Sequence, residues 1–235
     1  MRVSVVIPTH NEAQSIAYVL ADLPAGIVTE VLIVDSNSTD GTPEIAAKMG
    51  ARVIHEPRRG YGRACLTGLA AANSPDVVVF LDGDYSDRPA ELPLLLAPII
   101  DGRADITLGS RLGKQSVHGA LPWHQVFGNR LAAVLIRLLY GLKISDLGPF
   151  RAGRADVLRD LALEETTYGW AVEMILKGAL AGFRIVEVPV SYYPRIGKSK
   201  ISGTVKGTVG AAWFILSLIV RYYFRHRRAG TPRPA

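Results

Sequence analysis

The feature that most constrains the fold of this chain is a short apolar run, Val77–Leu81, which ends abruptly in Asp82, Gly83 and Asp84. Its length suits a single strand, and its lack of polar alternation predicts a strand covered on both faces, as in a parallel sheet between helices. Such sheets bind ligands at the carboxyl ends of their strands. Gly83 should let the chain turn sharply, so that Asp82 and Asp84 can share one hard cation. Taken alone, an Asp-Gly pair is equally typical of an ordinary turn.

Other apolar runs of strand length alternate with helical patterns. The further predicted strands are Arg2–Ile7, Glu30–Val34, Ala51–His55, Asp105–Leu108 and Ile185–Tyr192. The predicted helices are Asn11–Leu20, Pro43–Met49, Arg63–Ala72, Val126–Tyr140 and Trp170–Ala181. Pro8 should end the first strand, and Pro189 places the last one at a sheet edge. The alternation implies right-handed βαβ crossovers, so the predicted fold is α/β, with a mostly parallel, Rossmann-like sheet flanked by helices.

The charge balance indicates an anionic partner. The chain has 27 Lys+Arg against 21 Asp+Glu, a net charge of +6, which suits nucleic acid, phosphorylated substrates or a membrane surface. Much of the excess lies late, beside a strongly apolar segment, which favours a membrane and argues against nucleic acid. The single Cys65 excludes an internal disulfide framework and a cysteine-rich zinc site. Because a strand begins within two residues of the N-terminus, we expect no signal peptide and a cytoplasmic protein.

The C-terminal part is predicted to be separate from the main domain. We expect one domain over residues 1–206, a membrane-associating helix over 207–228 and a disordered tail over 229–235. Val209–Val220 carries no charge, but its twelve residues are too few to cross a bilayer, which needs about 20. Aromatic residues and the arginines that follow favour an amphiphilic helix lying on an anionic membrane surface. The alternative is a last helix packed on the core or on a partner chain.

Two familiar motifs are incomplete. Gly60 and Gly62 lack the third glycine of a dinucleotide fingerprint, and Gly197-Lys198-Ser199 has Tyr192 where a phosphate-binding loop needs its first glycine. The consistent signal is instead a set of carboxylates at predicted strand ends: Glu12, Asp35, Asp82 and Asp84. Parallel strands bring these residues to one edge of the sheet. Carboxylates around an oxygen-loving cation, Mg²⁺ or Mn²⁺, suit a substrate that carries a diphosphate.

Several motifs together resemble one enzyme family. They are Pro8-Thr-His-Asn11-Glu12, Val34-Asp35 through Asp40-Gly41-Thr42, Leu81-Asp82-Gly83-Asp84 and Gly109-Ser-Arg111. In combination they look like the family-2 glycosyltransferases of the GT-A fold. Three later stretches are similar to the dolichol-phosphate mannose or glucose synthases of that family: Asp146–Arg151, Gly169–Met174 and Arg195–Gly203. Many such relatives carry true transmembrane helices, whereas this chain offers only Val209–Val220.

The resemblance implies a role for each matching residue. The donor nucleotide would be held by Pro8, Asn11, Glu12, Asp35, Asp40, Asp82 and Gly83, and the metal by Asp84 with Asp82. The phosphate of a lipid acceptor would meet Arg111, Arg130, Arg195, Lys198 and Lys200. The catalytic set implied is Asp82, Asp84, Arg111 and Asp146.

The resemblance therefore implies a metal-dependent, inverting transfer of a hexose from a nucleotide-sugar to a polyprenyl or dolichyl phosphate, at the cytoplasmic face of a membrane. UDP-glucose is the first candidate donor, because Gly128-Asn-Arg130 and Asp146-Leu-Gly-Pro look more like the glucose-type relatives; GDP-mannose is the next. One alternative is transfer to a soluble or glycan hydroxyl, with Asp146 or Glu173 acting as a base. The other is a non-catalytic protein that binds nucleotide-sugars.

Overall fold

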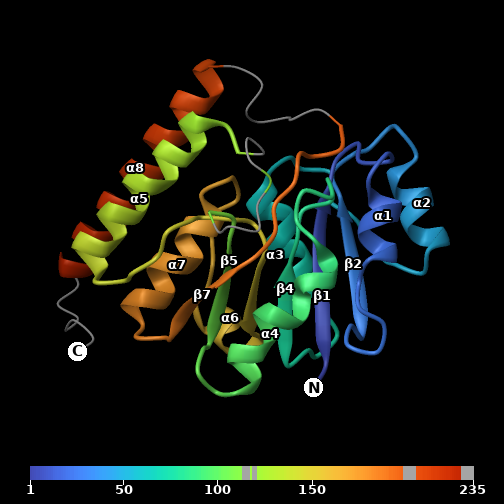
Figure 1. Cartoon of the computed structure of the whole chain (residues 1–235), viewed down its shortest axis with the longest axis horizontal. Helices are drawn as coiled ribbons and strands as arrows, with labels where there is room; N and C mark the ends of the chain where they lie inside the picture. The colour runs from blue at the N-terminus through green and yellow to red at the C-terminus, as the bar shows by residue number, and fades with distance from the viewer. Residues whose placement is uncertain (113–116, 118–120, 198–204, 229–235) are drawn as a thin grey trace.

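The computed structural model describes residues 1–112, 117, 121–197 and 205–228, and Figure 1 shows a sheet with helices on both faces. The strands are β1 (Val3–Thr9), β2 (Glu30–Asp35), β3 (Arg52–His55), β4 (Val77–Phe80), β5 (Ile106–Ser110), β6 (Arg151–Arg154) and β7 (Ile185–Pro189). They form a seven-stranded sheet in the order β3-β2-β1-β4-β6-β5-β7. Of these strands, only β6 is antiparallel to its neighbours. The predicted α/β fold with a mostly parallel sheet is confirmed, as is the edge position of β7.

The helices cover the sheet in two groups. They are α1 (Ile16–Ala21), α2 (Thr42–Lys48), α3 (Tyr61–Ala71), α4 (Leu92–Ile100), α5 (Trp123–Tyr140), α6 (Ala155–Asp160), α7 (Trp170–Leu180) and α8 (Val205–Arg228), with a short 3-10 turn η1 (Pro89–Glu91) before α4. Alternate side chains of β1 point to opposite faces of the sheet, as a strand requires. Val5 and Ile7 pack in the cluster that includes residues of α1, α2 and α4, while Val6 packs in the cluster that includes α3, α6 and α7.

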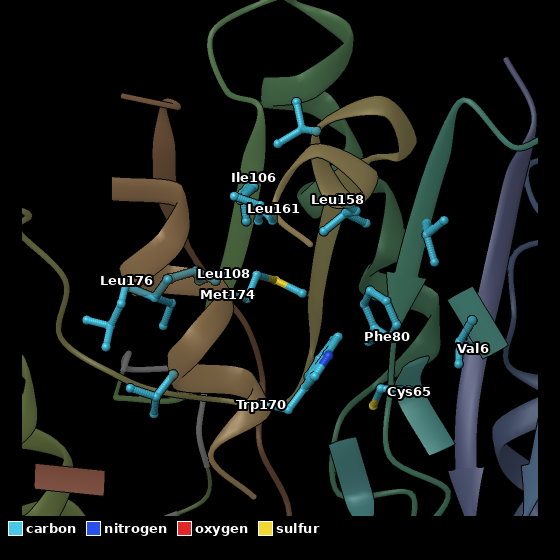
Figure 2. Packing of buried hydrophobic residues seen from close by; sticks show 14 of the residues in the cluster. Val6, Cys65, Phe80, Ile106, Leu108, Leu158, Leu161, Trp170, Met174 and Leu176 are labelled. Carbon is cyan, nitrogen blue, oxygen red and sulfur yellow. The ribbon is translucent and has the colours of Figure 1, made fainter. Parts of the chain in front are cut away.

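Figure 2 shows the second of these clusters. Trp170 of α7 is fully buried, and its ring meets that of Phe80 of β4 edge-on at 4.6 Å between centroids. Met174 and Cys65 lie beside this aromatic pair. Phe80, the last residue of β4, is therefore held in place by α7, next to the start of the acidic loop.

The first strand does not stop at Pro8 as predicted, but continues to Thr9. The carbonyl of Thr9 accepts a hydrogen bond from Ser36 beyond β2, so Pro8 faces the opposite side, toward β4. Pairing between β1 and β4 ends at Val6 and Phe80. The missing N–H of Pro8 therefore breaks no ladder hydrogen bond.

Other parts of the structure also differ from the prediction. The first helix begins at Ile16 rather than Asn11, because residues 11–15 form a turn in which Asn11 has φ of +55°. The strand predicted to reach Tyr192 ends at Pro189. The short antiparallel strand β6 was not predicted, and its first residue, Arg151, is fully buried.

The apolar segment Val209–Val220 is part of the longer helix α8, which lies alongside α5 (Figure 1). Leu218 and Ile219 are buried, and the carbonyl of Ile219 accepts a hydrogen bond from Tyr140 Oη of α5 (2.6 Å). Tyr222 Oη donates to Glu173 Oε1 of α7 (2.8 Å). This part of α8 thus contacts α5 and α7. Within the described residues, no helix has the length and apolar content that crossing a bilayer requires.

Candidate active site

A cleft of about 590 Å³ opens where β1, β2 and β4 end. Of the predicted site residues, Pro8, Glu12, Asp82, Gly83, Asp84 and Arg195 line it. The sequence interpretation did not assign Thr9, His10, Ser36, Arg59, Gly60, Tyr61, Ala64, Gln125, Thr167 and Tyr168, which also line it. The predicted convergence of strand ends on one edge of the sheet is therefore observed, and it gathers groups from the N-terminal half and from the segment after β7.

The turn after β4 differs in detail from the prediction. The left-handed residue is Tyr85, with φ of +60°, rather than Gly83. A side chain at Gly83 would place its Cβ 3.1 Å from Cγ2 of Thr9. A side chain at this position would therefore require Thr9 to shift by a few tenths of an ångström, whereas the backbone conformation of Gly83 is not left-handed.

Asp82 and Asp84 lie in this loop with unequal partners. Asp84 is buried, and its Oδ1 accepts hydrogen bonds from the backbone N (2.9 Å) and hydroxyl (2.5 Å) of Ser86. Its Oδ2 lies 2.9 Å from Nη2 of Arg195. Burial, and then the charge of Asp84, raise the pKa of Asp82 to about 7. The two carboxylates therefore differ: Asp84 is paired with Arg195, whereas burial disfavours the ionised form of Asp82.

A third carboxylate, Asp87, belongs to the same loop and was not predicted. It is buried, and neither carboxylate oxygen has a hydrogen-bond partner among the described residues. Burial, followed by the charge of Asp82, raises its pKa well above the ordinary value. The sequence signal was present as a third aspartate three residues after Asp84, but nothing local indicated that it would be buried.

The predicted donor-binding residues before α1 and before α2 are interlocked. Asn11 Oδ1 accepts from the N–H of Thr39 (2.8 Å), and Asp40 Oδ2 accepts from the N–H of Ala13 (3.0 Å). Asp40 also accepts hydrogen bonds from Thr42 at the start of α2. Asp35 is buried at the end of β2. These bonds build the rim of the cleft: Asn11 and Asp40 hold the two loops together.

Asp35 itself is tied to this rim. One of its oxygens accepts from the N–H of Ser38 (3.0 Å), and the other accepts from the hydroxyls of Ser38 and Thr9. Because Thr9 lies in β1 and lines the cleft, Asp35 is placed directly behind the cleft wall.

Arg111 and Asp146 form a buried ion pair. Nε and Nη2 of Arg111 lie 2.7 and 2.8 Å from the two oxygens of Asp146, and the backbone N–H of Arg111 donates to the same carboxylate. Asn129 and the N–H of Leu147 donate to it as well. The Arg111 guanidinium also lies 5.1 Å from the ring centre of Tyr192. Burial raises the pKa of Asp146, but the charge and hydrogen bonds of Arg111 outweigh this effect, so the pKa is lowered. Because its oxygens already accept these hydrogen bonds, Asp146 serves to fix Arg111.

Glu173 also has its hydrogen-bonding capacity engaged. Its carboxylate accepts from the N–H groups of Glu164 and Glu165, from Tyr222, and from Lys177 at 2.9 Å, one helical turn further along α7. The loop it holds, residues 164–168, supplies Thr167 and Tyr168 to the cleft. The same loop caps α3, since the carbonyls of residues 166 and 167 accept from the first N–H groups of that helix.

Of the described residues that were predicted to bind the acceptor phosphate, Arg195 lines the cleft, whereas Arg111 and Arg130 do not. Arg130 is exposed on α5 and does not line it. Lys198 and Lys200 lie outside the described residues. Arg195 does line the cleft, but its partners are the carboxylates of Asp84 and Glu12.

The donor set fits a divalent cation. Among the described residues no group of three or more His, Cys, Asp or Glu side chains is arranged to hold a metal ion. Asp82 and Asp84, the two carboxylates that the resemblance assigns to a metal, both line the cleft. One or two carboxylates, completed by substrate phosphates and water, are typical of Mg²⁺ in sites for phosphorylated substrates. A cation beside this pair would favour the ionised form of Asp82, which burial and the charge of Asp84 disfavour by raising its pKa.

Several known proteins resemble this chain in sequence. The profile described as "Glycosyl transferase family 2" matches residues 4–162. An uncharacterized glycosyltransferase of Mycobacterium bovis is 39% identical over 219 residues, covering 92% of this chain and 98% of the relative. The undecaprenyl-phosphate mannosyltransferase of Micrococcus luteus is 34% identical over 221 residues, covering 88% and 90%. A dolichyl-phosphate hexose transferase of Haloferax volcanii is 38% identical over 203 residues, covering 84% and 86%.

Solved structures share the fold. Glucosyl-3-phosphoglycerate synthase from Mycobacterium tuberculosis, in complex with Mn²⁺, UDP-glucose and phosphoglyceric acid, superposes with a TM-score of 0.75. The match covers 94% of this chain and 79% of the other, at 23% identity. At that identity the likeness establishes a common fold.

Proposed function

The chain belongs to glycosyl transferase family 2 and is a glycosyltransferase, and from this premise we propose that it moves a hexose from a nucleotide-sugar to the phosphate of a polyprenyl lipid. The observation that carries the proposal is the cleft, which gathers Glu12, Asp82 and Asp84 beside Arg195, the first residue of the basic segment after β7. Such a site has groups both for a diphosphate with its metal and for a second anion. Relatives named for undecaprenyl and dolichyl phosphates support the choice of acceptor.

The nucleotide-sugar would lie in the cleft. Pro8 and Glu12 line it, and Asp35 stands behind its wall, where carboxylates suit the N–H groups of a base and the hydroxyls of a ribose. Asn11 and Asp40 would contribute by holding the loop in shape. Asp84 and Asp82 would hold Mg²⁺ or Mn²⁺, which offsets the charge of the departing diphosphate. The chain's own contribution is to position the anomeric carbon against the acceptor oxygen.

The acceptor is proposed to be a phosphate because Asp146 and Glu173, the two candidate general bases, are already engaged in other contacts. A hydroxyl acceptor needs a general base, and both candidate bases are engaged in hydrogen bonds elsewhere. A phosphate is already ionised at neutral pH and needs no such base. Arg111, fixed by Asp146, and the basic residues 195–200 would then hold it through charge-assisted hydrogen bonds. Arg130 would act only from the periphery, since it is exposed and outside the cleft.

An exposed apolar surface supports a lipid as the carrier of that phosphate. Its members project from α5 and α8, which lie side by side (Figure 1), and are Trp123, Phe127, Leu131, Val134, Leu138, Trp213, Val220 and Phe224. The five on α5 are three or four residues apart and so form one stripe along the helix. Trp123 is 80% exposed and Trp213 is 75% exposed. Exposed aromatic stripes of this kind suit the interface of a membrane, so we propose peripheral attachment to the anionic cytoplasmic face.

The membrane part of the proposal is tested by sedimentation with anionic vesicles. Trp123→Ser with Phe127→Ser should leave more protein in the supernatant, because both side chains are exposed and their loss does not affect the core. Ile100→Ser is a matched control: Ile100 is 62% exposed, on the helix α4 that packs on the other face of the sheet. Equal loss of sedimentation in the control would show that general surface hydrophobicity, and not this surface, accounts for binding.

The donor is tested by thermal shift with UDP-glucose and GDP-mannose, each with and without Mn²⁺. A ligand at 100 times its dissociation constant stabilises the folded protein by about 2.7 kcal/mol. We expect one nucleotide to give a Mn²⁺-dependent shift, with UDP-glucose the first candidate. Absence of a shift with every nucleotide-sugar would contradict the proposed donor.

The acceptor is tested by steady-state kinetics in which each substrate is varied in turn. A charge-assisted bond to phosphate contributes about 1.5–3 kcal/mol, so Lys198→Ala or Lys200→Ala should raise the apparent constant for the lipid at least about tenfold. The constant for the donor should hardly change. A loss confined to the nucleotide-sugar would place this segment on the donor diphosphate instead.

A further inference from the structure

The guanidinium of Arg195 contacts the carboxylate oxygen of Asp84 that a metal would need. Nη2 of Arg195 lies 2.9 Å from Oδ2 of Asp84 and 3.7 Å from Oε1 of Glu12. The other oxygen of Asp84 is already engaged by the N–H and hydroxyl of Ser86. Oδ2 is therefore the oxygen of Asp84 best placed to receive a cation, and the guanidinium of Arg195 already contacts it. The side chain of Asp84 is 6% exposed, so water screens this contact weakly.

The backbone keeps Arg195 in this position. The segment that carries it runs along the acidic loop: the N–H of Ile196 donates to the carbonyl of Asp84 (3.0 Å), and that of Tyr193 donates to the carbonyl of Ser86 (2.9 Å). Asp87 and Tyr192 form an antiparallel bridge one step further along. The segment is thus held along the acidic loop by two backbone hydrogen bonds and an isolated β-bridge.

A stack of side chains reinforces the same attachment. The guanidinium of Arg88 lies 4.2 Å from the ring centre of Tyr85 and 3.8 Å from that of Tyr193, between the two rings. Tyr85 belongs to the acidic loop, and Tyr193 to the segment of Arg195. Because contacts on both sides of residue 195 fix the segment, Arg195 meets Asp84 through a built contact and not through a chance approach of a long side chain.

We propose that Arg195 is an internal counter-cation of Asp84, which the divalent cation must displace. Two cations cannot share one buried carboxylate oxygen without strong repulsion, so the metal and the guanidinium compete for it. A displaced Arg195 loses its anionic partner, and phosphate groups entering the same cleft are its natural replacement. Metal binding and anion binding are then coupled, each favouring the other. This inference rests on the proposed function in taking Asp84 as the metal ligand.

The test measures Mn²⁺ binding to the full chain without nucleotide, by the loss of the free-ion signal in electron paramagnetic resonance. Arg195→Gln removes the competing guanidinium and should tighten Mn²⁺ binding by about tenfold or more. The reason is that the metal-free variant no longer has the charge-assisted contact with Asp84 that the metal must break. Arg195→Lys keeps a cation and should stay close to the wild type. Circular dichroism and the melting temperature report whether each variant is folded.

A matched control separates the effect of the contact between Arg195 and Asp84 from the effect of the overall positive charge in the cleft. Arg59→Gln removes the same charge from an exposed residue that lines the same cleft, and it should tighten Mn²⁺ binding much less than Arg195→Gln. Equal tightening in both variants would overturn the proposal, because only the overall field would then matter. Unchanged or weaker binding in folded Arg195→Gln would overturn it as well.

Asp84→Asn distinguishes failure of this inference from failure of the proposed function. If Asp84→Asn loses Mn²⁺ binding while Arg195→Gln binds as the wild type does, the metal site stands and the competition is refuted. If Asp84→Asn binds Mn²⁺ as well as the wild type, the metal assignment itself is wrong, and the inference falls with it.

Discussion

Replacing Asp146 by asparagine tests whether this carboxylate fixes Arg111. The pair is buried, with side chains 0% and 11% exposed, and Asp146 accepts hydrogen bonds from three nitrogen atoms of Arg111. Asp146→Asn keeps the shape of the side chain but removes the negative charge. Arg111 would then remain buried with a positive charge that this partner no longer offsets.

The expected loss is large. Breaking a buried ion pair from one side costs about 3–5 kcal/mol, because the remaining charge stays desolvated. For a chain of this size, about 3 kcal/mol corresponds to a fall in melting temperature of roughly 6–12 °C. The comparison is with Asp101 and Arg103, which also lie 2.8 Å apart but have side chains 53% and 62% exposed. Asp101→Asn should cost about 1 kcal/mol or less.

The assay is urea unfolding followed by circular dichroism, with both variants and the wild type measured at the same pH. The variants should share the wild-type slope, so that the midpoints report stability directly. A loss for Asp146→Asn within about 1 kcal/mol of the loss for Asp101→Asn would refute the reasoning, since it would show no special cost of burial. The role of Asp146 in fixing Arg111 further predicts that the variant raises the constant for the acceptor and keeps the shape of the pH profile. Loss of the acidic limb, the fall in rate at low pH that protonation of a base produces, would instead identify Asp146 as a general base.

Three further predictions concern separate parts of the structure. Asp84→Asn should abolish the Mn²⁺-dependent thermal shift with the donor and keep the circular dichroism spectrum; a full Mn²⁺-dependent shift would show that the metal lies elsewhere. Tyr222→Phe removes the hydroxyl that donates to Glu173, so stability should fall by about 1.5–3 kcal/mol in urea unfolding, as for other hydrogen bonds to charged groups; no loss would mean that α8 is not held there. Hydrogen bonds from Arg58, and then from Thr67, lower the pKa of Glu56 to about 2, so its contribution to stability is complete above pH 4.5 and is lost as the pH falls toward 2. Glu56→Gln should therefore destabilise the protein at pH 7, with a difference from the wild type that shrinks between pH 5 and pH 3; a difference independent of pH would contradict this.

Most of the strands and helices were predictable because local patterns specify them, whereas α4, α6 and β6 were not predicted. Apolar runs such as Val77–Leu81 read as buried strands, and the rule that parallel strands end at one edge correctly grouped Glu12, Asp82 and Asp84. The antiparallel strand β6 was missed because its four residues, Arg151–Arg154, carry no apolar run. Arg151 is buried all the same, since its guanidinium donates to the carbonyls of Ala171 and Gly148. Such compensation comes from distant segments and leaves no local signal.

The candidate site was predictable only where a motif marked it. Thr167 and Tyr168 reach the cleft because Glu173 anchors their loop, and Glu173 is in turn contacted by Tyr222 from α8. The contact of Arg195 with Asp84 depends on backbone pairing between segments more than 100 residues apart in sequence. Charge patterning indicated that Arg195 would meet an anion, but not that this anion would be the carboxylate of a predicted metal ligand.

The most direct test of the central claim is transfer of the sugar itself. The purified full chain is incubated with Mn²⁺ and radiolabelled UDP-glucose or GDP-mannose, together with polyprenyl phosphate in anionic vesicles or with phosphoglyceric acid as a soluble acceptor. The proposed function predicts that label from one of the two donors enters the organic phase with the lipid, and that Asp84→Asn abolishes this transfer. Label that reaches only the soluble acceptor, with none in the lipid from either donor, would contradict it.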